Sequence, residues 1–461
     1  LNRWEGRRVL KDEKGNIIDI LPSLTEWLKV PDRTKIRALL ERLAFEAHQR
    51  QVRISGTADV PEDDLLLGLV RLQQNKDVNS QKLKEFLVNR AGLLVPRGQG
   101  VYTFSHRTMQ EYLAACHLTR TGYPGKVAHL ACHDPLRWRE VVLLAGARAG
   151  SGAEFALWAL VDSLSPEKAS EDCPVDRQWG ALLAGQMLVE SANYQEVEEI
   201  NQPKLDRIRL RLVHILRTGE PPALERVSAG TVLACLGDPR PELMTIEGMQ
   251  FCFVQAGEFW YGAGEKAVLK DLPDFWLGQH PVSNAQFAVF VKDWGYGDPR
   301  WWKEAQKDHY WSKAGFREGY ADEPRCGPFV FVEPFSLPNH PVVGVSWYEA
   351  LAFTLWLDEF AHRKGWIAEK WHICLPDEQE WEKAAHGGLK LPSQVVRQSL
   401  CDGFDLPRVV TLANHSPLRE YPWEGDFNPE YANTGETRIG STSALGCFPQ
   451  GMGPYGCLDL S

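Results

Sequence analysis

The sequence lacks several features that would assign a function directly. It contains no apolar run of about 18 residues and no basic segment followed by an apolar one near its start, so we predict neither a membrane span nor a signal peptide. It also has no Gly-x4-Gly-Lys-Ser/Thr segment, and no Gly-x-Gly-x-x-Gly follows a strand pattern. This chain alone is therefore not expected to bind and hydrolyse ATP, and a cytoplasmic location is predicted.

Patterned cysteines and an excess of basic charge are absent as well. The ten cysteines form no Cys-x-x-Cys pair and no tight framework, which favours buried free thiols. With 51 basic against 61 acidic residues, the net charge of -10 argues against a broad phosphate-binding surface, so nucleic acid is not a predicted partner. Leu1 is not a start methionine, and we expect the chain to be part of a longer protein. Its 461 residues exceed one core and predict about two to four domains.

The first quarter of the chain has the pattern of a winged helix. Apolar side chains recur at helical spacing over residues 32–51, and a second helix is expected to end at Gly92. Residues 93–104 then predict a β-hairpin, and a further helix is expected from about Arg107. DNA binding is the usual role of such a module, but the hairpin carries only Arg97 as a basic residue, which favours a packing or signalling role.

Residues 136–236 contain a series of amphipathic segments. Leu, Ala and Val recur in them at helical spacing with Pro or Gly in the gaps, which predicts antiparallel helical pairs stacked as a short solenoid. The segments are 138–147, 153–163, 177–191, 204–217 and 222–236. The run Gly237–Pro241 ends the pattern and marks a predicted domain boundary.

Beyond residue 242 the composition changes, because twelve of the seventeen tryptophans lie there. Short apolar runs at 251–254 and 329–332 alternate with Gly/Pro turns, and helices are predicted over 283–293 and 347–363. This pattern predicts an α+β domain with irregular loops pinned by aromatic side chains. One aromatic insertion could line a binding surface or form the core of a loop, and the second interpretation is favoured. It comprises Trp301, Trp302, Tyr310, Trp311 and Tyr320.

Five motifs in this region resemble, in the same order, those of the formylglycine-generating-enzyme (sulfatase-modifying factor) family. The motifs are Ala256–Gly262 (AGEFWYG), Pro281–Phe287 (PVSNAQF), Asn339–Trp347 (NHPVVGVSW), Leu375–Glu382 (LPDEQEWE) and Tyr431–Thr434 (YANT). The resemblance implies a C-type-lectin-like fold, which serves either as an oxidase or as a binding scaffold.

The resemblance also bears on catalytic and metal-binding residues. In that family, oxidation of a substrate cysteine depends on two cysteines near the end of the domain that hold copper. The motif that precedes them would begin after Ser461, so no catalytic residue is assigned. Cys447 and Cys457 are the nearest by position, and ordinary burial is the favoured interpretation. The family's structural calcium site would begin at Asn433 and Thr434, with a turn that binds no ion as an equal alternative.

A related group, the sulfoxide synthases of thiol-histidine biosynthesis, uses a three-histidine iron site. The single match to its His-x3-His piece runs from His129 to His133, and Asp134 and Pro135 follow instead of x-Glu. With no third ligand visible, coincidence is favoured over a metal site.

A second resemblance covers residues 1–120. The segment Phe104–Ala115 (FSHRTMQEYLAA), together with Leu1–Glu5, resembles the segment that follows the nucleotide-binding core in NACHT-type STAND NTPases, which implies a regulatory helical arm. Within that arm His106 would be a sensor histidine that contacts bound nucleotide. The favoured alternative is a helix-start histidine satisfied by its own backbone. ATP would act only through an NTPase domain outside this chain.

Together these observations predict a multidomain protein, with an all-α N-terminal half (a winged-helix-like module and a helical solenoid) followed by an α+β C-type-lectin-like domain. The predicted domains are residues 1–120, 121–241 and 242–461, with the C-terminal part of the last one missing. The predicted function is recognition of a protein or small-molecule ligand for a STAND (NACHT-like) signalling or defence ATPase that forms a homo-oligomer on activation, with no membrane partner. One form of this hypothesis makes the lectin-like domain the target of a diversity-generating retroelement. The alternative function is a copper or iron oxidase acting on a thiol.

Overall fold

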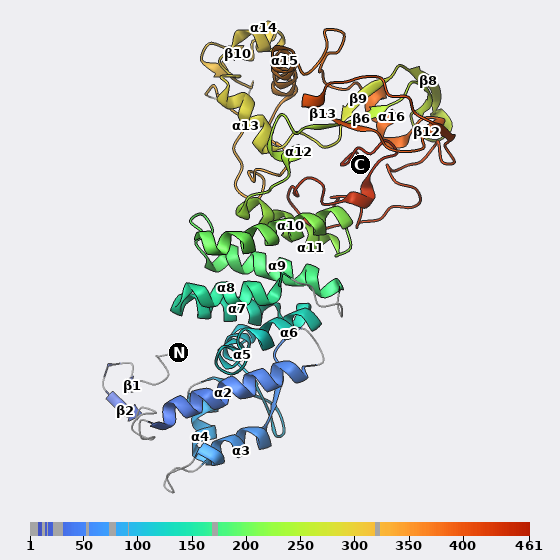
Figure 1. The fold of residues 1–461 in the computed structure, drawn as a ribbon. Coiled ribbons are helices and arrows are strands. Elements are labelled where there is room, and N and C mark those ends of the chain that lie inside the picture. Colours follow the sequence, from blue (N-terminus) through green and yellow to red (C-terminus); the bar gives the residue numbers. More distant parts are fainter. Residues whose placement is uncertain are drawn as a thin grey trace. The chain divides into compact units, whose positions relative to one another are not determined.

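The computed structural model describes residues 8–11, 14–15, 17–21, 31–51, 55–72, 80–90, 92–167, 174–318 and 323–461. The chain forms two compact units, Leu1–Lys204 and Leu205–Ser461. Figure 1 shows the elements of each unit, coloured along the sequence. The predicted fold class is confirmed, since helices dominate the first unit and an α+β region follows. The motif residues Leu1–Glu5 lie outside the described residues.

The first part of unit one is the expected winged-helix arrangement. Its sheet has the antiparallel order β3-β5-β4, and the β4–β5 hairpin pairs Leu94 with Phe104. The predicted C-cap Gly92 has a φ of 61°, which is a left-handed conformation that glycine adopts without strain. The elements are β1 Arg8–Lys11, β2 Ile17–Leu21, α2 Pro31–Arg50, β3 Asp59–Pro61, α3 Glu62–Leu72, α4 Ser80–Glu85, the π-helical turn η1 Phe86–Arg90, β4 Leu94–Gly98, β5 Val101–Phe104 and α5 Arg107–Thr121.

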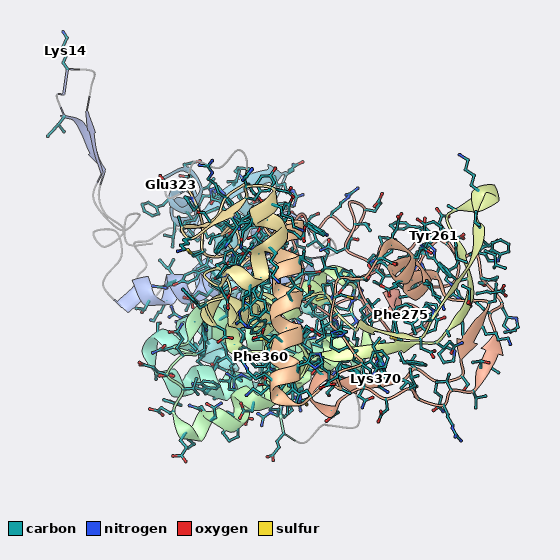
Figure 2. The ribbon with its side chains drawn as sticks, turned by 90° about the horizontal axis from the view of Figure 1, so that it is seen from above. Lys14, Tyr261, Phe275, Glu323, Phe360 and Lys370 are labelled. Atoms are coloured by element: carbon teal, nitrogen blue, oxygen red, sulfur yellow. The ribbon has the colours of Figure 1, made fainter. Side chains whose placement is uncertain are left out.

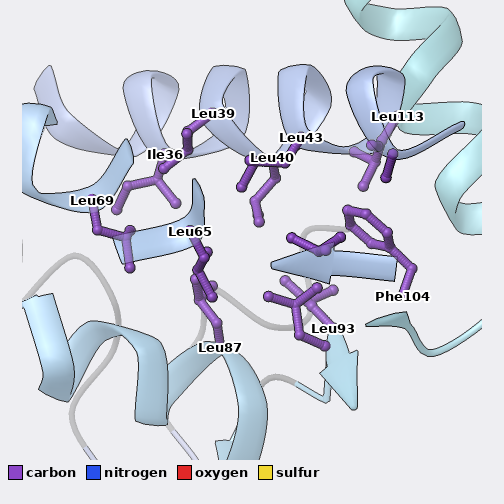
Figure 3. Close-up of a cluster of buried hydrophobic side chains, with 14 of the residues drawn as sticks. Ile36, Leu39, Leu40, Leu43, Leu65, Leu69, Leu87, Leu93, Phe104 and Leu113 are labelled. Atoms are coloured by element: carbon purple, nitrogen blue, oxygen red, sulfur yellow. The ribbon is translucent and has the colours of Figure 1, made fainter. Parts of the chain in front are cut away.

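A single apolar core joins these helices to the hairpin. Ile36 and Leu40 of α2, Leu65 of α3, and Phe104 of β5 are almost completely buried against one another. Figure 3 shows these side chains meeting between the helices and the strand. Burying side chains of this size is worth roughly 1.5–3 kcal/mol each, so this cluster holds the module together.

The rest of unit one consists of helices that follow the predicted amphipathic segments. They are α6 Gly125–His133, α7 Pro135–Gly152, α8 Glu154–Leu164, α9 Pro174–Ser191 and the short 3-10 helix η2 Glu199–Asn201. Helices α8 and α9 approach closely at Gly180, where a Cβ atom would lie 2.1 Å from the carbonyl oxygen of Leu164. Among the described residues, none of the helices combines the length and the apolar character that a bilayer span requires.

Unit two begins within the first of two helices that we had predicted as the end of the solenoid. They are α10 Gln202–Thr218 and α11 Ala223–Leu236. Arg226 of α11 is 2% exposed and donates hydrogen bonds to the carbonyl oxygens of Cys447 (2.8 Å) and Pro221 (2.7 Å), and to that of Glu430. Because partners so distant in sequence bind α11, the division between the units precedes the predicted boundary at 241/242.

The remainder of unit two is the α+β region. Its three-stranded sheet has the antiparallel order β13-β6-β9, and the other strands form three separate pairs. The elements are α12 Pro241–Met244, β6 Gln250–Val254, β7 Gly257–Tyr261, η3 Gly264–Lys266, β8 Val268–Leu272, β9 Phe275–Gly278, α13 Asn284–Lys292, η4 Pro299–Trp302, α14 Lys303–Lys307, β10 Trp311–Ser312, β11 Gly315–Phe316, α15 Trp347–Lys364, α16 Glu378–His386, β12 Lys390–Pro392, β13 Arg397–Ser399, η5 Leu400–Asp402, β14 Thr411–Ala413 and η6 Pro449–Gly451.

Three of the sequence motifs turn out to be helix starts. Ser283, Ser346 and Asp377 cap α13, α15 and α16, and in each case the residue three positions later completes a reciprocal capping box. These bonds satisfy backbone N–H groups that the first helical turn leaves unpaired. The motifs therefore fix where the helices of this unit begin.

Aromatic side chains fill the core of unit two. Trp302 is 1% exposed and packs against Tyr296 at a ring distance of 5.0 Å, while its Nε1 donates to the carbonyl oxygen of Gly295. Trp301 is also buried, and Tyr310 and Trp311 pack against the same cluster. The aromatic insertion thus forms core, as the favoured interpretation expected, although Tyr320 lies outside the described residues.

Candidate functional site

The main candidate site of unit two is an apolar pocket of about 410 Å³. Its walls come from β6 and β9, from one face of α15, and from the loop between α15 and α16. The lining includes Phe251, Phe275, Trp276, Leu277, His280, Phe353, Thr354, Leu357, Trp371, His372, Ile373, Glu380, Phe404, Asp459 and Leu460. Figure 2 labels Phe275, which lies on the strand β9. A concave, mostly apolar cavity with a few polar groups is the usual form of a ligand site.

Three polar atoms of this lining are buried without a hydrogen-bond partner in the described structure. They are the indole Nε1 of Trp276, the indole Nε1 of Trp371, and the imidazole Nδ1 of His280. Buried polar atoms almost always have a hydrogen-bond partner in folded proteins, so three unpaired atoms around one cavity indicate that a bound molecule supplies the missing partners. A ligand that carries hydrogen-bond acceptors would supply it.

His280 is an uncharged member of the pocket wall. Burial, reinforced by the positive charges of Arg240, Arg397 and Arg217, lowers its pKa to about 3. A neutral imidazole has one donor and one acceptor nitrogen, so at neutral pH His280 can bind either an acceptor or a donor of a ligand. The pocket therefore has no positive charge from this residue.

A short segment connects the pocket with α11. A Cβ atom at Gly446 would lie 3.5 Å from the imidazole of His280, so this backbone runs directly beside the pocket wall. On either side of it, the carbonyl oxygen of Leu445 accepts from Arg240 at 2.9 Å and that of Cys447 accepts from Arg226 of α11 at 2.8 Å. The segment 445–447 is thus packed between the pocket and the helix.

The predicted calcium residues have a structural role in the described loop. The side-chain amide nitrogen of Asn433 donates to the carbonyl oxygen of Ser441 (2.9 Å) and to Ser443 Oγ (3.2 Å). The backbone N–H of Thr434 donates to Thr437 Oγ1 at 3.3 Å. These bonds leave the amide oxygen of Asn433 available as a ligand, so the donor chemistry fits calcium in part. Calcium at this loop stays a prediction.

His106 stands at the N-cap position of α5. Its side chain is exposed and makes no capping hydrogen bond. Its carbonyl oxygen accepts from the backbone N–H of Gln110 at 3.2 Å, as the first turn of a helix requires. The structure therefore lacks the side-chain capping bond to the backbone that the favoured alternative expected at His106. Sensing of nucleotide by His106 stays a prediction.

The structure does not join the two cysteines that lie nearest the family's catalytic segment. Cys447 Sγ contacts the carbonyl oxygen of Arg226 at 3.7 Å, and burial raises the pKa of this thiol to about 12. Cys457 instead forms a buried pair with Cys252, and their hydrogen bond together with burial raises the pKa of Cys457. Neither is an accessible thiolate, so the expectation of ordinary burial holds for both.

His129 and His133 lie one turn apart on α6, with ring centroids 4.0 Å apart. No third His, Cys, Asp or Glu side chain joins them in the part of the chain that the structure describes. Within the described residues the pair therefore lacks the three protein ligands that catalytic metal sites use, and no metal is proposed there.

The pocket itself was not predicted from the sequence. Trp276 follows the first motif and His280 precedes the second, but neither belongs to a spacing that indicates a cavity. Trp371 comes from the loop after α15. The only available signal was the concentration of tryptophans beyond residue 242, which indicates aromatic packing without showing which indole N–H groups lack partners.

Comparison with known domain families matches two segments of the chain. Residues 238–461 match the sulfatase-modifying factor enzyme 1-like domain, and residues 1–118 match the winged helix-turn-helix domain C-terminal to NACHT. The first match contains the whole pocket. The chain therefore carries a NACHT-associated winged helix and a formylglycine-generating-enzyme-type domain, in that order.

The names of individual relatives include the enzyme class of the match at residues 238–461. The chain is similar to the serine/threonine-protein kinase Pkn1 of Chlamydia trachomatis (31% identity, 38% of this chain and 25% of the relative) and to the formylglycine-generating enzyme of Thermomonospora curvata (30%, 40% and 56%). It is also similar to the hercynine oxygenase of Mycobacterium tuberculosis (28%, 41% and 36%). The chain thus spans between a quarter and a little over half of these relatives.

Proposed function

We propose that this chain is the recognition and signal-coupling part of a STAND (NACHT-like) signalling or defence ATPase. In this proposal the sulfatase-modifying-factor-like domain binds a ligand in the pocket, and ATP acts through an NTPase domain in cis. The observation that carries the proposal is the apolar pocket with three unpaired polar atoms in its wall. A ligand with an aromatic or aliphatic body and acceptor atoms at its edge would satisfy both features.

The coupling step of the proposal uses the segment 445–447. A ligand that displaces His280 would press on the backbone at Gly446, which is held on both sides by buried arginines. Arg226 belongs to α11, so a shift of the segment would be passed to that helix. A ligand can act in this way only if it binds the two arrangements with different affinity.

The alternative function is oxidation of a thiol, which the similarity to a formylglycine-generating enzyme favours. The two thiols nearest the catalytic segment of that family are buried and bonded separately, so they do not fit a shared copper ion. No catalytic step is derived from them. The alternative is tested by incubating the protein and Cu⁺ with a cysteine-containing peptide and O₂ as the oxidant, where formation of an aldehyde would favour the oxidase and its absence would favour the binding role.

The pocket is tested with the fluorescent probe 8-anilinonaphthalene-1-sulfonate, which has an apolar body and an acceptor group. In Trp371→Phe the wall keeps its apolar surface but loses one unpaired donor, so we expect the probe to bind about fivefold more weakly, which corresponds to the roughly 1 kcal/mol of one hydrogen bond. The matched control is Trp347→Phe, because Trp347 is 59% exposed and lies outside the pocket lining. Equal affinities for both variants would count against the pocket.

Three finer parts of the proposal follow from the family resemblances. Calcium would bind at Asn433 and Thr434, so addition of Ca²⁺ should raise the unfolding temperature of the chain. An unchanged unfolding temperature would contradict calcium binding. Diversification by a retroelement would concentrate substitutions between independent isolates on surface positions in the final segment of the lectin-like domain, and an even distribution would contradict it. Assembly into a homo-oligomer on activation would appear as a ligand-dependent increase in mass by light scattering, and an unchanged mass would exclude it under those conditions.

A further inference from the structure

Three metal-ligating side chains of unit two converge where α15 ends. Asp358 and His362 lie one helical turn apart on α15, so their side chains share one face of the helix. His372 comes from the loop that follows. His362 Nε2 lies 3.5 Å from Asp358 Oδ1, and His372 Nδ1 lies 3.3 Å from Asp358 Oδ2. One ligand atom from each of the three residues lies within 4.8 Å of the others.

The loop after α15 is folded so that it brings His372 back to the helix. Gly365 ends α15 with a φ of 72°, and the backbone N–H of Trp366 then donates to the carbonyl oxygen of Ala361 at 3.0 Å. Seven residues later, the backbone N–H of Ile373 donates to Asp358 Oδ1 at 2.8 Å. This last bond orients the carboxylate and holds His372 beside it, as outer partners do around bound metals.

The distances suit a small divalent ion. Ligand bonds of about 2.1 Å in a tetrahedral arrangement place ligand atoms roughly 3.4 Å apart. The two separations from the carboxylate, 3.5 and 3.3 Å, are close to this value. In addition, His362 Nε2 is buried and makes no hydrogen bond in the described structure. An ion between the side chains would give that nitrogen a partner.

The three side chains are accessible to an ion from solvent, and the neighbouring basic side chains Arg363 and Lys370 contact other groups. The side chain of His372 is 71% exposed, whereas those of Asp358 and His362 are 22% and 26% exposed. The basic side chains nearby have other partners, since Arg363 pairs with Asp293 and Lys370 lies over the ring of Trp371. Figure 2 shows α15 with Phe360 labelled and Lys370 in the loop beyond it.

We propose that Asp358, His362 and His372 form a binding site for a zinc-class divalent ion. Two imidazoles and one carboxylate are a ligand set that such ions accept, with at least one coordination position left for water or another ligand. Because His372 also lines the pocket, the ion would lie at its rim. The site stands on its own geometry and does not depend on the proposed recognition function.

The site is tested on the whole chain with Co²⁺, which reports its coordination by visible absorption, and with Zn²⁺ in competition. We expect one equivalent of Co²⁺ to bind, to be displaced by Zn²⁺, and to be unaffected by an excess of Mg²⁺, which prefers oxygen ligands. His372→Asn and Asp358→Asn should each weaken binding by at least about tenfold, the lower end of what loss of outer partners alone causes. His372 is exposed, so its replacement should leave the fold intact, and an asparagine at 358 can still accept from Ile373.

Two control variants separate this site from weaker pairs elsewhere in the chain. His386→Gln removes the histidine of a similar pair on α16, where His386 Nδ1 lies 3.9 Å from Glu382 Oε1. His133→Gln removes one of the two histidines on α6. Both controls should bind Co²⁺ as the unmodified chain does. Absence of stoichiometric binding, or binding that survives in His372→Asn and Asp358→Asn, would overturn the proposal.

Discussion

Replacing Arg226 by methionine should strongly destabilise unit two. The guanidinium is 2% exposed and donates to the carbonyl oxygens of Gly219 (3.1 Å), Pro221 (2.7 Å) and Cys447 (2.8 Å), and to that of Glu430. Methionine fills a similar volume but leaves these oxygens without a donor. Each lost bond to a charged donor costs about 1.5–3 kcal/mol, and because the four losses are not additive, we expect a total cost of about 3–5 kcal/mol.

The assay is urea unfolding of the whole chain, followed by tryptophan fluorescence, because twelve of the seventeen tryptophans lie beyond residue 242. The matched control is Arg300→Met. The Arg300 side chain is 56% exposed, and its partners Asp298 and Glu359 are carboxylates at the surface, so little change is expected. If Arg226→Met lowered the free energy of unfolding no more than this control does, the argument that the hydrogen bonds of Arg226 hold α11 in unit two would be refuted.

Three further results are expected. Gly180→Ala should destabilise unit one by about 1–3 kcal/mol, because the added Cβ would lie 2.1 Å from a carbonyl oxygen. The control Gly152→Ala should leave the stability unchanged, because its added Cβ has no neighbour within 4 Å. Equal effects of the two variants in thermal unfolding would refute this packing argument. Burial lowers the pKa of Lys383 from 10.5 to about 8, so between these pH values the unfolded chain holds a proton that the folded chain has lost. The free energy of unfolding should therefore rise with pH between about 8 and 10.5. Urea titrations of Lys383→Met should show no such rise. Burial likewise lowers the pKa of His340 from 6.5 to about 4, so stability should fall as the pH drops from 6.5 to 4, and a His340→Gln variant that lost stability just as steeply would contradict this assignment.

Local features of the fold could be predicted from the sequence because they depend on neighbouring residues. The amphipathic segments became helices, and the hairpin formed where short apolar runs flank Gly98 and Gly100. The motifs around Ser283 and Ser346 contain both partners of a capping box within three residues, so the starts of these helices could be predicted as well. By contrast, the apolar run at 329–332 is an exposed segment outside the strands, because nothing in the run itself shows whether a core will cover it.

Features that depend on distant residues could not be predicted in the same way. Arg226 and its acceptor Cys447 are 221 residues apart, and no periodicity connects them, so the packing of α11 against this segment could not be predicted. The pocket likewise combines strands, a helix and a loop. The proposed metal site was partly visible, since Asp358 and His362 have the spacing of one helical turn within a predicted helix, but the position of His372 depends on how the following loop folds.

Amide hydrogen exchange can show whether a ligand in the pocket alters α11. Exchange would be measured with and without saturating 8-anilinonaphthalene-1-sulfonate, in the unmodified chain and in Trp371→Phe at the same probe concentration. The probe should change exchange both in the loop around Trp371 and in α11 (Ala223–Leu236), and both changes should diminish in the variant. A change confined to the pocket, with α11 unaffected, would contradict the coupling.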